Sequence, residues 1–389
     1  MTLASSNLRL LAIGTDPALL RPRDDAFGDA HQRQLRYASI LRDYHMVVRS
    51  LSGSSAPIHH GAGFTVHPSG SRSRVAFPLD AYRVGSRLQR ATRFDLVSTE
   101  DPMLCGLAGY LLRRRYGIPL SVQIAGDMID SPHWLRERRV NPLLNALAKR
   151  LVRSADSVRV VSERERAKLI RLGVTPERVW NIGWISDFER FGGIEASDLR
   201  ERLLGGCRHL LLFMGRLVLQ KDLPTLLRAM AAIRVARDDV RLVVAGDGPE
   251  RASAEALAAG LGIADRVTFV GTVVYPDVPR YYAACDVVLA STVYEGNSRV
   301  LAEAGAAGRP VITNDVSGAA DTVTEDETGF ILPVGDAEGM ARRALELLDD
   351  QGRAIAMGAR ASEHVRQLYG AESLLPRFAE FWAMTAQTR

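Results

Sequence analysis

Short apolar runs rich in β-branched residues alternate with amphipathic segments along the whole chain of 389 residues. Apolar runs of this kind predict strands, and apolar positions three or four residues apart predict helices. In the first half, strands are expected at 8–14, 45–51, 94–100, 119–127 and 156–162. The second half begins the pattern afresh, with strands expected at 209–215, 241–248, 266–271, 286–292, 310–315 and 329–334.

The intervals between these strands carry helical periodicity. Helices are expected at 32–43, 101–116, 141–154, 163–172, 223–236, 250–261, 276–284, 298–307 and 336–349. Strands that alternate with helices are typical of βαβ units in parallel sheets, and the chain is too long for one core. We therefore predict an α/β protein of two doubly wound domains, 1–186 and 187–371, which meet in the linker-like segment 181–193. An amphipathic segment, 372–389, follows them.

The net charge of +5 comes from basic clusters in the first half of the chain, at 111–117, 134–140 and 148–155. One such cluster is typical of a solvated helix face. Three together favour contact with anionic lipid head groups or with a phosphate-bearing substrate. Nucleic acid is disfavoured, because aromatic residues make up only 6% of the chain and do not interleave with the basic runs.

The three cysteines, Cys105, Cys207 and Cys285, are isolated in the sequence, which fits a reducing compartment and argues against a zinc site. The histidines have no acidic or cysteine partners at ligand spacing, so the sequence does not support a metal site. No cofactor is expected. No apolar run approaches the ~20 residues that span a bilayer, and the first residues are too polar for a secretory signal. A cytoplasmic protein is expected.

In open parallel sheets, ligands bind at the carboxyl ends of the strands. The strand expected at 209–215 is followed by "GRLVLQKDL", which holds Gly215, Arg216 and Lys221. Glycine permits a close approach of the backbone, and an arginine with a lysine suits phosphate oxygens. Taken alone, an arginine and a lysine five residues apart are more typical of ordinary surface charge.

The strand expected at 286–292 is followed by "VYEGNSRVLAEAGAAGRPVI", in which Asn297 or Ser298 would cap a helix. The uncapped amides of its first turn, around Ser298, Arg299 and Val300, would form an anion site.

Two carboxylates flank this anion site. Glu295 lies in the loop before the helix, and Glu303 lies about two turns along it. A ligand with a phosphate between two sets of hydroxyls, as in a nucleotide sugar, would fit this arrangement. Alternatively, Glu303 pairs with a basic neighbour on a surface helix.

A set of motifs in the second half resembles the family 4 glycosyltransferases of the GT-B fold. The motifs are "GRLVLQKDL", "VVAGDGPE", "VTFVG", "YYAACDVVLAST", "EGNSRVLAEAGAAGRPVI" and "DETGFILPVGD", in the family's order and spacing. The resemblance implies two Rossmann-like domains that face a central cleft. It also implies a nucleotide-sugar donor held mainly by the C-terminal domain, retention of anomeric configuration, and no metal.

The resemblance also assigns roles to residues of the second half. Arg216 and Lys221 would stabilise the leaving diphosphate, Glu303 would bind the ribose, and Glu295 would hold the donor sugar. The further donor-binding positions would be Gly215, Gly246, Gly271, Asn297, Ser298, Arg299 and Val300.

The first half resembles the family more weakly. Ala125, in "QIAGD", stands where the family commonly has a histidine that positions the donor sugar, and Asp127 is the nearest polar substitute or an ordinary helix cap. Gly28 would approach the diphosphate. The segment 372–389 would form the helix that crosses back to the first domain.

The expected function is transfer of a hexosyl group from a UDP- or GDP-sugar to a hydroxyl acceptor, in polysaccharide or glycolipid assembly. The basic first half hints at a lipid-linked acceptor and a peripheral location at the inner face of the membrane; a small-molecule acceptor stays open. Alternatives are a different enzyme of this fold, such as a nucleotide-sugar epimerase or a glycan phosphorylase, a dehydrogenase suggested by "GAGFTV" (61–66), and a non-catalytic nucleotide-sugar sensor suggested by Ala125.

Overall fold

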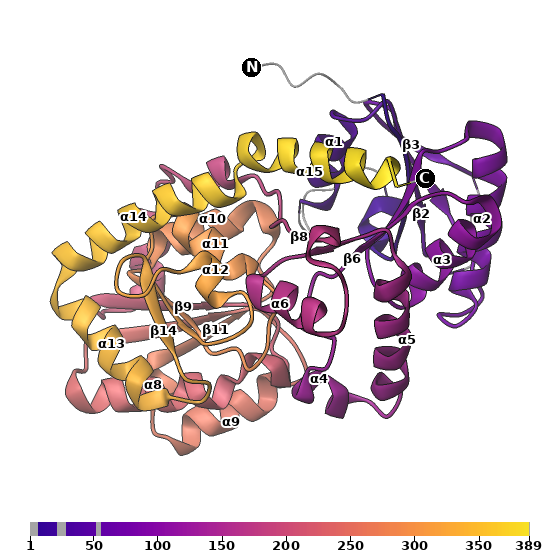
Figure 1. The fold of residues 1–389 in the computed structure, drawn as a ribbon. Coiled ribbons are helices and arrows are strands. Elements are labelled where there is room, and N and C mark those ends of the chain that lie inside the picture. Colours follow the sequence, from indigo (N-terminus) through magenta and orange to yellow (C-terminus); the bar gives the residue numbers. More distant parts are fainter. Residues whose placement is uncertain (1–6, 22–28, 52–55, 389) are drawn as a thin grey trace. The chain divides into compact units, whose positions relative to one another are not determined.

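A computed structural model describes residues 7–21, 29–51 and 56–388. The chain divides into two compact units. The N-terminal unit comprises Met1–Ser186 together with Ala371–Arg389, and the C-terminal unit comprises Asp187–Gly370. Each unit is an α/β structure built on a sheet of largely parallel strands (Figure 1).

The N-terminal unit carries a mostly parallel sheet. Its strands are β1 (Arg9–Gly14), β2 (Asp43–Val48), β3 (Ile58–Gly61), β4 (Phe64–Pro68), β5 (Leu96–Thr99), β6 (Leu120–Gln123), β7 (Ser157–Val160) and β8 (Val179–Asn181). Its α-helices are α1 (Ala30–Ala38), α2 (Phe77–Thr92), α3 (Leu104–Tyr116), α4 (Pro132–Glu137), α5 (Asn141–Ser154), α6 (Glu163–Arg171) and α15 (Ala371–Ala386).

The strand order of this sheet is β3-β4-β2-β1-β5-β6-β7-β8. The chain therefore changes direction across the sheet between the paired strands β1 and β5, and this reversal is where such folds bind ligands. The helix α15 belongs to this unit through its apolar face. The rings of Phe378 and Trp382 lie 4.7 and 5.5 Å from the ring of Tyr37 in α1.

The C-terminal unit carries a parallel sheet. Its strands are β9 (His209–Met214), β10 (Val240–Ala245), β11 (Val267–Gly271), β12 (Val287–Ala290), β13 (Val311–Asn314) and β14 (Gly329–Leu332). Its α-helices are α7 (Ser197–Leu204), α8 (Leu223–Ala236), α9 (Arg251–Gly260), α10 (Val278–Ala284), α11 (Arg299–Ala306), α12 (Ala319–Thr322), α13 (Ala337–Asp349) and α14 (Gln351–Tyr369). The order β11-β10-β9-β12-β13-β14 is that of a dinucleotide-binding fold, with the reversal between β9 and β12.

The apolar runs become strands because helices cover both faces of each sheet. Successive residues of β9, such as Leu211 and Leu212, are both fully buried although their side chains point to opposite faces. The small-residue run of α11 has its own cause. A Cβ atom added to Gly305 would lie 2.7 Å from Val365 Cγ2, so small side chains let α11 approach α14 closely.

The segment "GAGFTV" folds as part of a hairpin. Gly61, Ala62 and Gly63 have positive φ angles of 91°, 48° and 76° and form the turn between the antiparallel strands β3 and β4. These glycines therefore do not lie in a strand-turn-helix unit. The interpretation of this run as a dinucleotide-binding motif is wrong, because the turn geometry, and not a ligand, requires the glycines.

Candidate functional site

The loops that follow β9 and β12 are joined to each other at the strand reversal of the C-terminal unit. The amide of Val293 donates to the Gln220 carbonyl at 2.9 Å, and Gln220 Nε2 donates to the Tyr294 carbonyl at 2.7 Å. Ser291 Oγ donates to the Lys221 carbonyl at 2.9 Å. These bonds join the two loops, which are about seventy residues apart in sequence, into one surface.

Lys221 and Glu295 come together on this surface. The Lys221 ammonium pairs with a carboxylate oxygen of Glu295, and the side chains are 13% and 22% exposed. Arg216, on the same loop as Lys221, is exposed, and among the described residues its guanidinium has no hydrogen bond or ion pair. A phosphate group could therefore bind Arg216 directly and compete with Glu295 for Lys221.

The backbone next to these loops is closely packed. Gly215, Gly246 and Gly271 lie at the ends of the neighbouring strands β9, β10 and β11, and the Gly246 amide donates to the Gly271 carbonyl at 2.8 Å. A Cβ atom added to Gly246, which has a φ of 141°, would lie 1.8 Å from the Gly215 carbonyl oxygen. Only glycine fits there.

Helix α11 begins beside Glu295. Ser298 is its N-cap residue and makes no side-chain cap bond, while Arg299 and Val300 are its first two residues. The first amides of any helix need partners from outside the helix, such as a side chain or a ligand. Asn297 is held from behind, since its Nδ2 donates to the Tyr369 hydroxyl at 2.8 Å.

Glu303 is buried, with 6% of its surface exposed. The Tyr282 hydroxyl donates to Glu303 Oε2 at 3.0 Å, and Arg299 lies 3.5 Å from Oε1. Burial, together with the nearby Glu303 charge, raises the pKa of Tyr282 well above its ordinary value, so Tyr282 stays a hydrogen-bond donor. Glu303 does pair with a basic neighbour, but the alternative interpretation, which placed it on a surface helix, is wrong because the side chain is buried.

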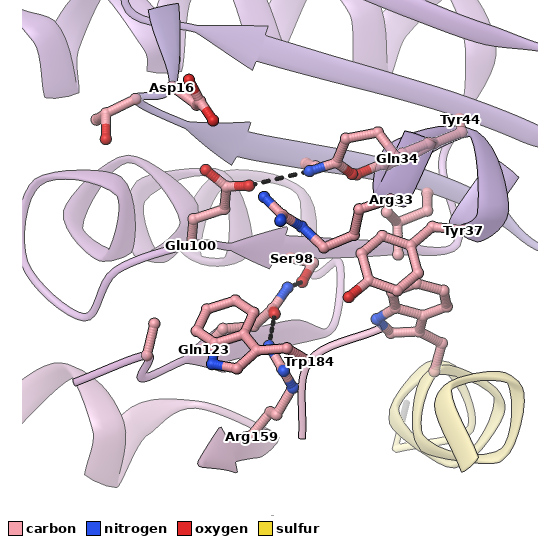
Figure 2. A pocket seen from close by; sticks show the side chains of 15 residues that line it. Asp16, Arg33, Gln34, Tyr37, Tyr44, Ser98, Glu100, Gln123, Arg159 and Trp184 are labelled. Atoms are coloured by element: carbon pink, nitrogen blue, oxygen red, sulfur yellow. Dashed lines mark hydrogen bonds between the residues drawn. The ribbon is translucent and has the colours of Figure 1, made fainter. Parts of the chain in front are cut away.

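A second candidate site is a cavity of about 170 Å³ in the N-terminal unit (Figure 2). It lies at the reversal between β1 and β5, where Asp16 follows β1 and Glu100 follows β5. The other polar or aromatic residues of its wall are Thr15, Arg33, Gln34, Tyr37, Tyr44, Ser98, Gln123, Arg159, Trp184 and Trp382.

Glu100 is the central carboxyl of this cavity. Gln34 Nε2 donates to Glu100 Oε1 at 3.2 Å, and the Tyr44 hydroxyl donates to Gln34 Oε1 at 2.6 Å (Figure 2). The surrounding protein desolvates the carboxyl and raises its pKa to about 7. A Cβ atom added to Gly14 would lie 2.2 Å from Glu100 Oε2, so glycine at the end of β1 makes room for this carboxyl.

Arg159 forms the floor of the cavity and is 1% exposed. It donates to the carbonyls of Ile182 and Gly183 and to Gln123 Oε1, at 2.6–2.8 Å. Its guanidinium also lies 4.9 Å from the Trp184 ring. Burial lowers the pKa of Arg159 to about 10, which leaves the side chain charged at neutral pH.

Three expected positions of the N-terminal unit have different outcomes. Ala125 lines the cavity. Asp127 is not part of its described wall; it accepts from Lys168 Nζ at 2.6 Å and is not the N-cap of a helix. Gly28 lies outside the described residues.

The sequence interpretation missed Glu100 and Arg159. The sequence contains a signal for each residue. Glu100 directly follows the strand 96–99, and Arg159 is a charged residue inside "SVRV", a run of otherwise apolar or small residues.

The described residues hold neither a membrane-spanning helix nor a cluster of metal ligands. No helix among them has the length and apolar character needed to cross a bilayer. Within the same residues, no group of three or more histidine, cysteine, aspartate or glutamate side chains could hold a metal ion.

Comparisons with known proteins match both units. Residues 198–364 match the family model described as glycosyl transferases group 1, and residues 31–182 match a glycosyl transferase 4-like domain. The chain is 31% identical to alpha-D-kanosaminyltransferase of Streptomyces kanamyceticus, over 62% of this chain and 64% of that protein. It is 32% identical to the GDP-mannose-dependent alpha-(1-6)-phosphatidylinositol monomannoside mannosyltransferase of Mycobacterium tuberculosis, over 62% and 65%. The chain thus spans just under two thirds of the length of these relatives.

Solved structures match over nearly the whole chain. Sucrose-phosphate synthase from Thermosynechococcus elongatus superposes with a TM-score of 0.80 at 24% identity and covers 96% of this chain and 98% of that one. Anabaena HepE in complex with UDP superposes with a TM-score of 0.77 at 20% identity, over 97% and 100%. These matches place the fold in the GT-B class.

Proposed function

The chain belongs to the family 4 glycosyltransferases, and we propose that it transfers a hexosyl group from a UDP- or GDP-sugar to a hydroxyl acceptor. The observation that carries this proposal is the Lys221–Glu295 pair, which lies beside the exposed Arg216 and the start of α11. Two cations and a helix N-terminus around one carboxylate suit a diphosphate that is bonded to a sugar.

In this proposal, each residue has one task. Arg216 and Lys221 neutralise the charge that develops on the diphosphate as its bond to the anomeric carbon breaks. Glu295, released from Lys221, accepts from hydroxyls of the donor sugar, and the buried Glu303 accepts from the ribose. The glycine-lined strand ends leave room for the base.

The acceptor hydroxyl forms the new bond to the anomeric carbon. Its proton goes to an oxygen of the departing diphosphate, on the same face of the sugar, so that the anomeric configuration is retained. No residue of the chain acts as a general base in this scheme, and no metal is required.

A uridine donor and a guanosine donor are both consistent with the proteins that this chain is similar to. The HepE structure contains UDP, and the mycobacterial mannosyltransferase is named for GDP-mannose. Their acceptors differ as well, because other relatives are named for D-inositol 3-phosphate and for 2-deoxystreptamine.

Peripheral contact with an anionic membrane is part of the proposal. Val140 and Leu143 are 47% and 72% exposed, beside the exposed Arg136, Arg138 and Arg139. Exposed apolar side chains that are close to arginines in the sequence suit an anionic interface. Co-sedimentation with phosphatidylglycerol vesicles, but not with phosphatidylcholine vesicles, is the expected result.

Nucleotide release tests the transfer reaction itself. The purified chain is incubated with UDP- and GDP-sugars and a panel of hydroxyl acceptors, and free nucleotide and glycosylated product are measured together. Product formation supports the proposal. An interconverted sugar still attached to its nucleotide would indicate an epimerase, and nucleotide-sugar binding without turnover would indicate a sensor.

A further inference from the structure

Two hydrogen-bond donors that line the cavity of the N-terminal unit have no acceptor in the described part of the protein. Trp382 lines the cavity and is 1% exposed, and its Nε1 has no hydrogen-bond acceptor among the described residues. Tyr37 lines it as well and is 5% exposed, and within the described chain its hydroxyl makes no hydrogen bond. A buried donor without an acceptor is costly, so Trp382 Nε1 suits an oxygen atom of a ligand, and the Tyr37 hydroxyl is available to a second one.

The cationic groups of the cavity are partly engaged by the protein. Arg33 Nη1 pairs with Asp29 at 3.0 Å. The three nitrogens of the Arg159 guanidinium donate to two carbonyls and to Gln123. An incoming anion would have to compete with Asp29 for Arg33, whose charge also stabilises the Glu100 carboxylate, and each nitrogen of Arg159 already donates to the protein.

The carboxyl groups of the cavity, in contrast, have few partners in the described part of the protein. Asp16 Oδ1 accepts only from the nearby Ala18 amide at 3.0 Å, as far as the described residues go, and Glu100 accepts from Gln34. Neither carboxyl forms an ion pair with any side chain in the described part of the chain. Figure 2 shows both at the upper side of the cavity, with Glu100 beside Gln34 and Arg33. Ligand groups that donate hydrogen bonds or carry positive charge suit this side.

We propose that this cavity is the subsite for a compact polyhydroxylated ring bearing an amine, with the ammonium held by Glu100 and ring hydroxyls bonded to Trp382 and Tyr37. At about 170 Å³ the cavity equals roughly five or six water volumes, which suits a single ring and not an oligosaccharide. The assignment of this ring as the acceptor rests on the proposed transfer function. The assignment of the cavity as its binding site does not.

Three probes of equal ring size test the preference. They are myo-inositol, the inosamine in which one hydroxyl is replaced by an amine, and inositol 1-phosphate. Each is titrated by calorimetry into the full chain. We expect the inosamine to bind most tightly, by about tenfold over inositol, because a charge-assisted bond adds about 1.5 kcal/mol or more. We expect inositol 1-phosphate to bind least well.

Two variants and a control locate the binding. Glu100→Ala should weaken inosamine binding about tenfold or more and remove its advantage over inositol, and Trp382→Phe should weaken both probes. Glu177→Ala, which removes an exposed carboxylate of the same unit, should change neither. Circular dichroism verifies that the variants are folded.

The results separate this inference from the proposed function. Tighter binding of inositol 1-phosphate, equal inosamine affinity in Glu100→Ala, or no binding of any probe would overturn the cavity assignment. UDP and GDP are titrated into the same samples. Absence of nucleotide binding with intact inosamine binding would contradict the transfer function alone.

Discussion

The ammonium of Lys221 pairs with the carboxylate of Glu295 between two loops that backbone hydrogen bonds already hold together. The pair is therefore positioned before any ligand arrives. A positioned cation at a strand end stabilises charge without reorganising during the reaction. The same contact also keeps Glu295 in place, to accept from sugar hydroxyls once a phosphate engages Lys221.

Removal of the Lys221 charge should affect turnover far more than folding. Lys221→Ala is expected to lower kcat by roughly 100-fold or more, as for other groups that stabilise developing charge. The free energy of unfolding should change by about 1 kcal/mol or less, because the pair is partly exposed. Lys149→Ala, which breaks a pair with Asp130 at 2.9 Å in the N-terminal unit, is the matched control. Unchanged turnover in Lys221→Ala would contradict the proposed role of Lys221 in stabilising the phosphate charge.

The loss of Glu303 should weaken donor binding specifically. Glu303→Ala removes the expected ribose contact and leaves the buried Tyr282 hydroxyl without this acceptor, at a cost of about 1–3 kcal/mol in stability. Tyr282→Phe removes the same internal bond but keeps the carboxylate, so it serves as the control. Donor Kd from calorimetry should rise about tenfold or more for Glu303→Ala and much less for Tyr282→Phe. Equal donor Kd values for the two variants would show that the Glu303 carboxylate has only a structural role.

Gly246 should tolerate no side chain. In Gly246→Ala the new methyl carbon would meet the Gly215 carbonyl, and the backbone would keep a φ that alanine rarely adopts, so we expect a loss of stability of several kcal/mol. Gly260→Ala, at the end of α9, is the control, since a Cβ there meets nothing within 4 Å. Urea unfolding followed by circular dichroism should show the contrast. A Gly246→Ala variant as stable as Gly260→Ala would contradict the close approach of β9 and β10.

Glu100 should make the N-terminal unit less stable as the pH rises. Its pKa lies near 7 in the folded chain and near 4.5 when unfolded, so the folded state holds the proton more tightly. The contribution is most favourable below about pH 4.5 and is lost through pH 7, by roughly 1–3 kcal/mol. Glu100→Gln should flatten this dependence between pH 5 and pH 8.

Tryptophan fluorescence follows this change in one unit. All four tryptophans, Trp134, Trp180, Trp184 and Trp382, belong to the N-terminal unit, so urea unfolding monitored by their emission reports that unit. The same slope of stability with pH in wild type and Glu100→Gln would show that another group controls it.

The local pattern of apolar and polar residues was sufficient to predict most of the fold. The α/β class was predicted correctly, and the expected helices at 141–154 and 223–236 coincide with α5 and α8. The strands β3, β4 and β8 were missed. Two of these are short, and "IHHGAGFTVHP" is polar because its strands form a sheet edge and a tight turn.

The two sites differ in how far the sequence reveals them. Residues of the C-terminal site directly follow strands, so the binding rule for parallel sheets selects Arg216, Lys221 and Glu295. The cavity depends on partners far apart in sequence, such as Gln34 with Glu100, 66 positions on. No local pattern indicates that the two side chains meet.

The most direct test of the central claim is calorimetric titration of UDP and GDP into the wild-type chain and into Lys221→Ala. The claim is that the loops after β9 and β12 form a nucleotide-sugar site. We predict that one of the two nucleotides binds the wild type with a single site, and that Lys221→Ala weakens that binding at least about tenfold. Binding of neither nucleotide, or equal affinity in the variant, would contradict it.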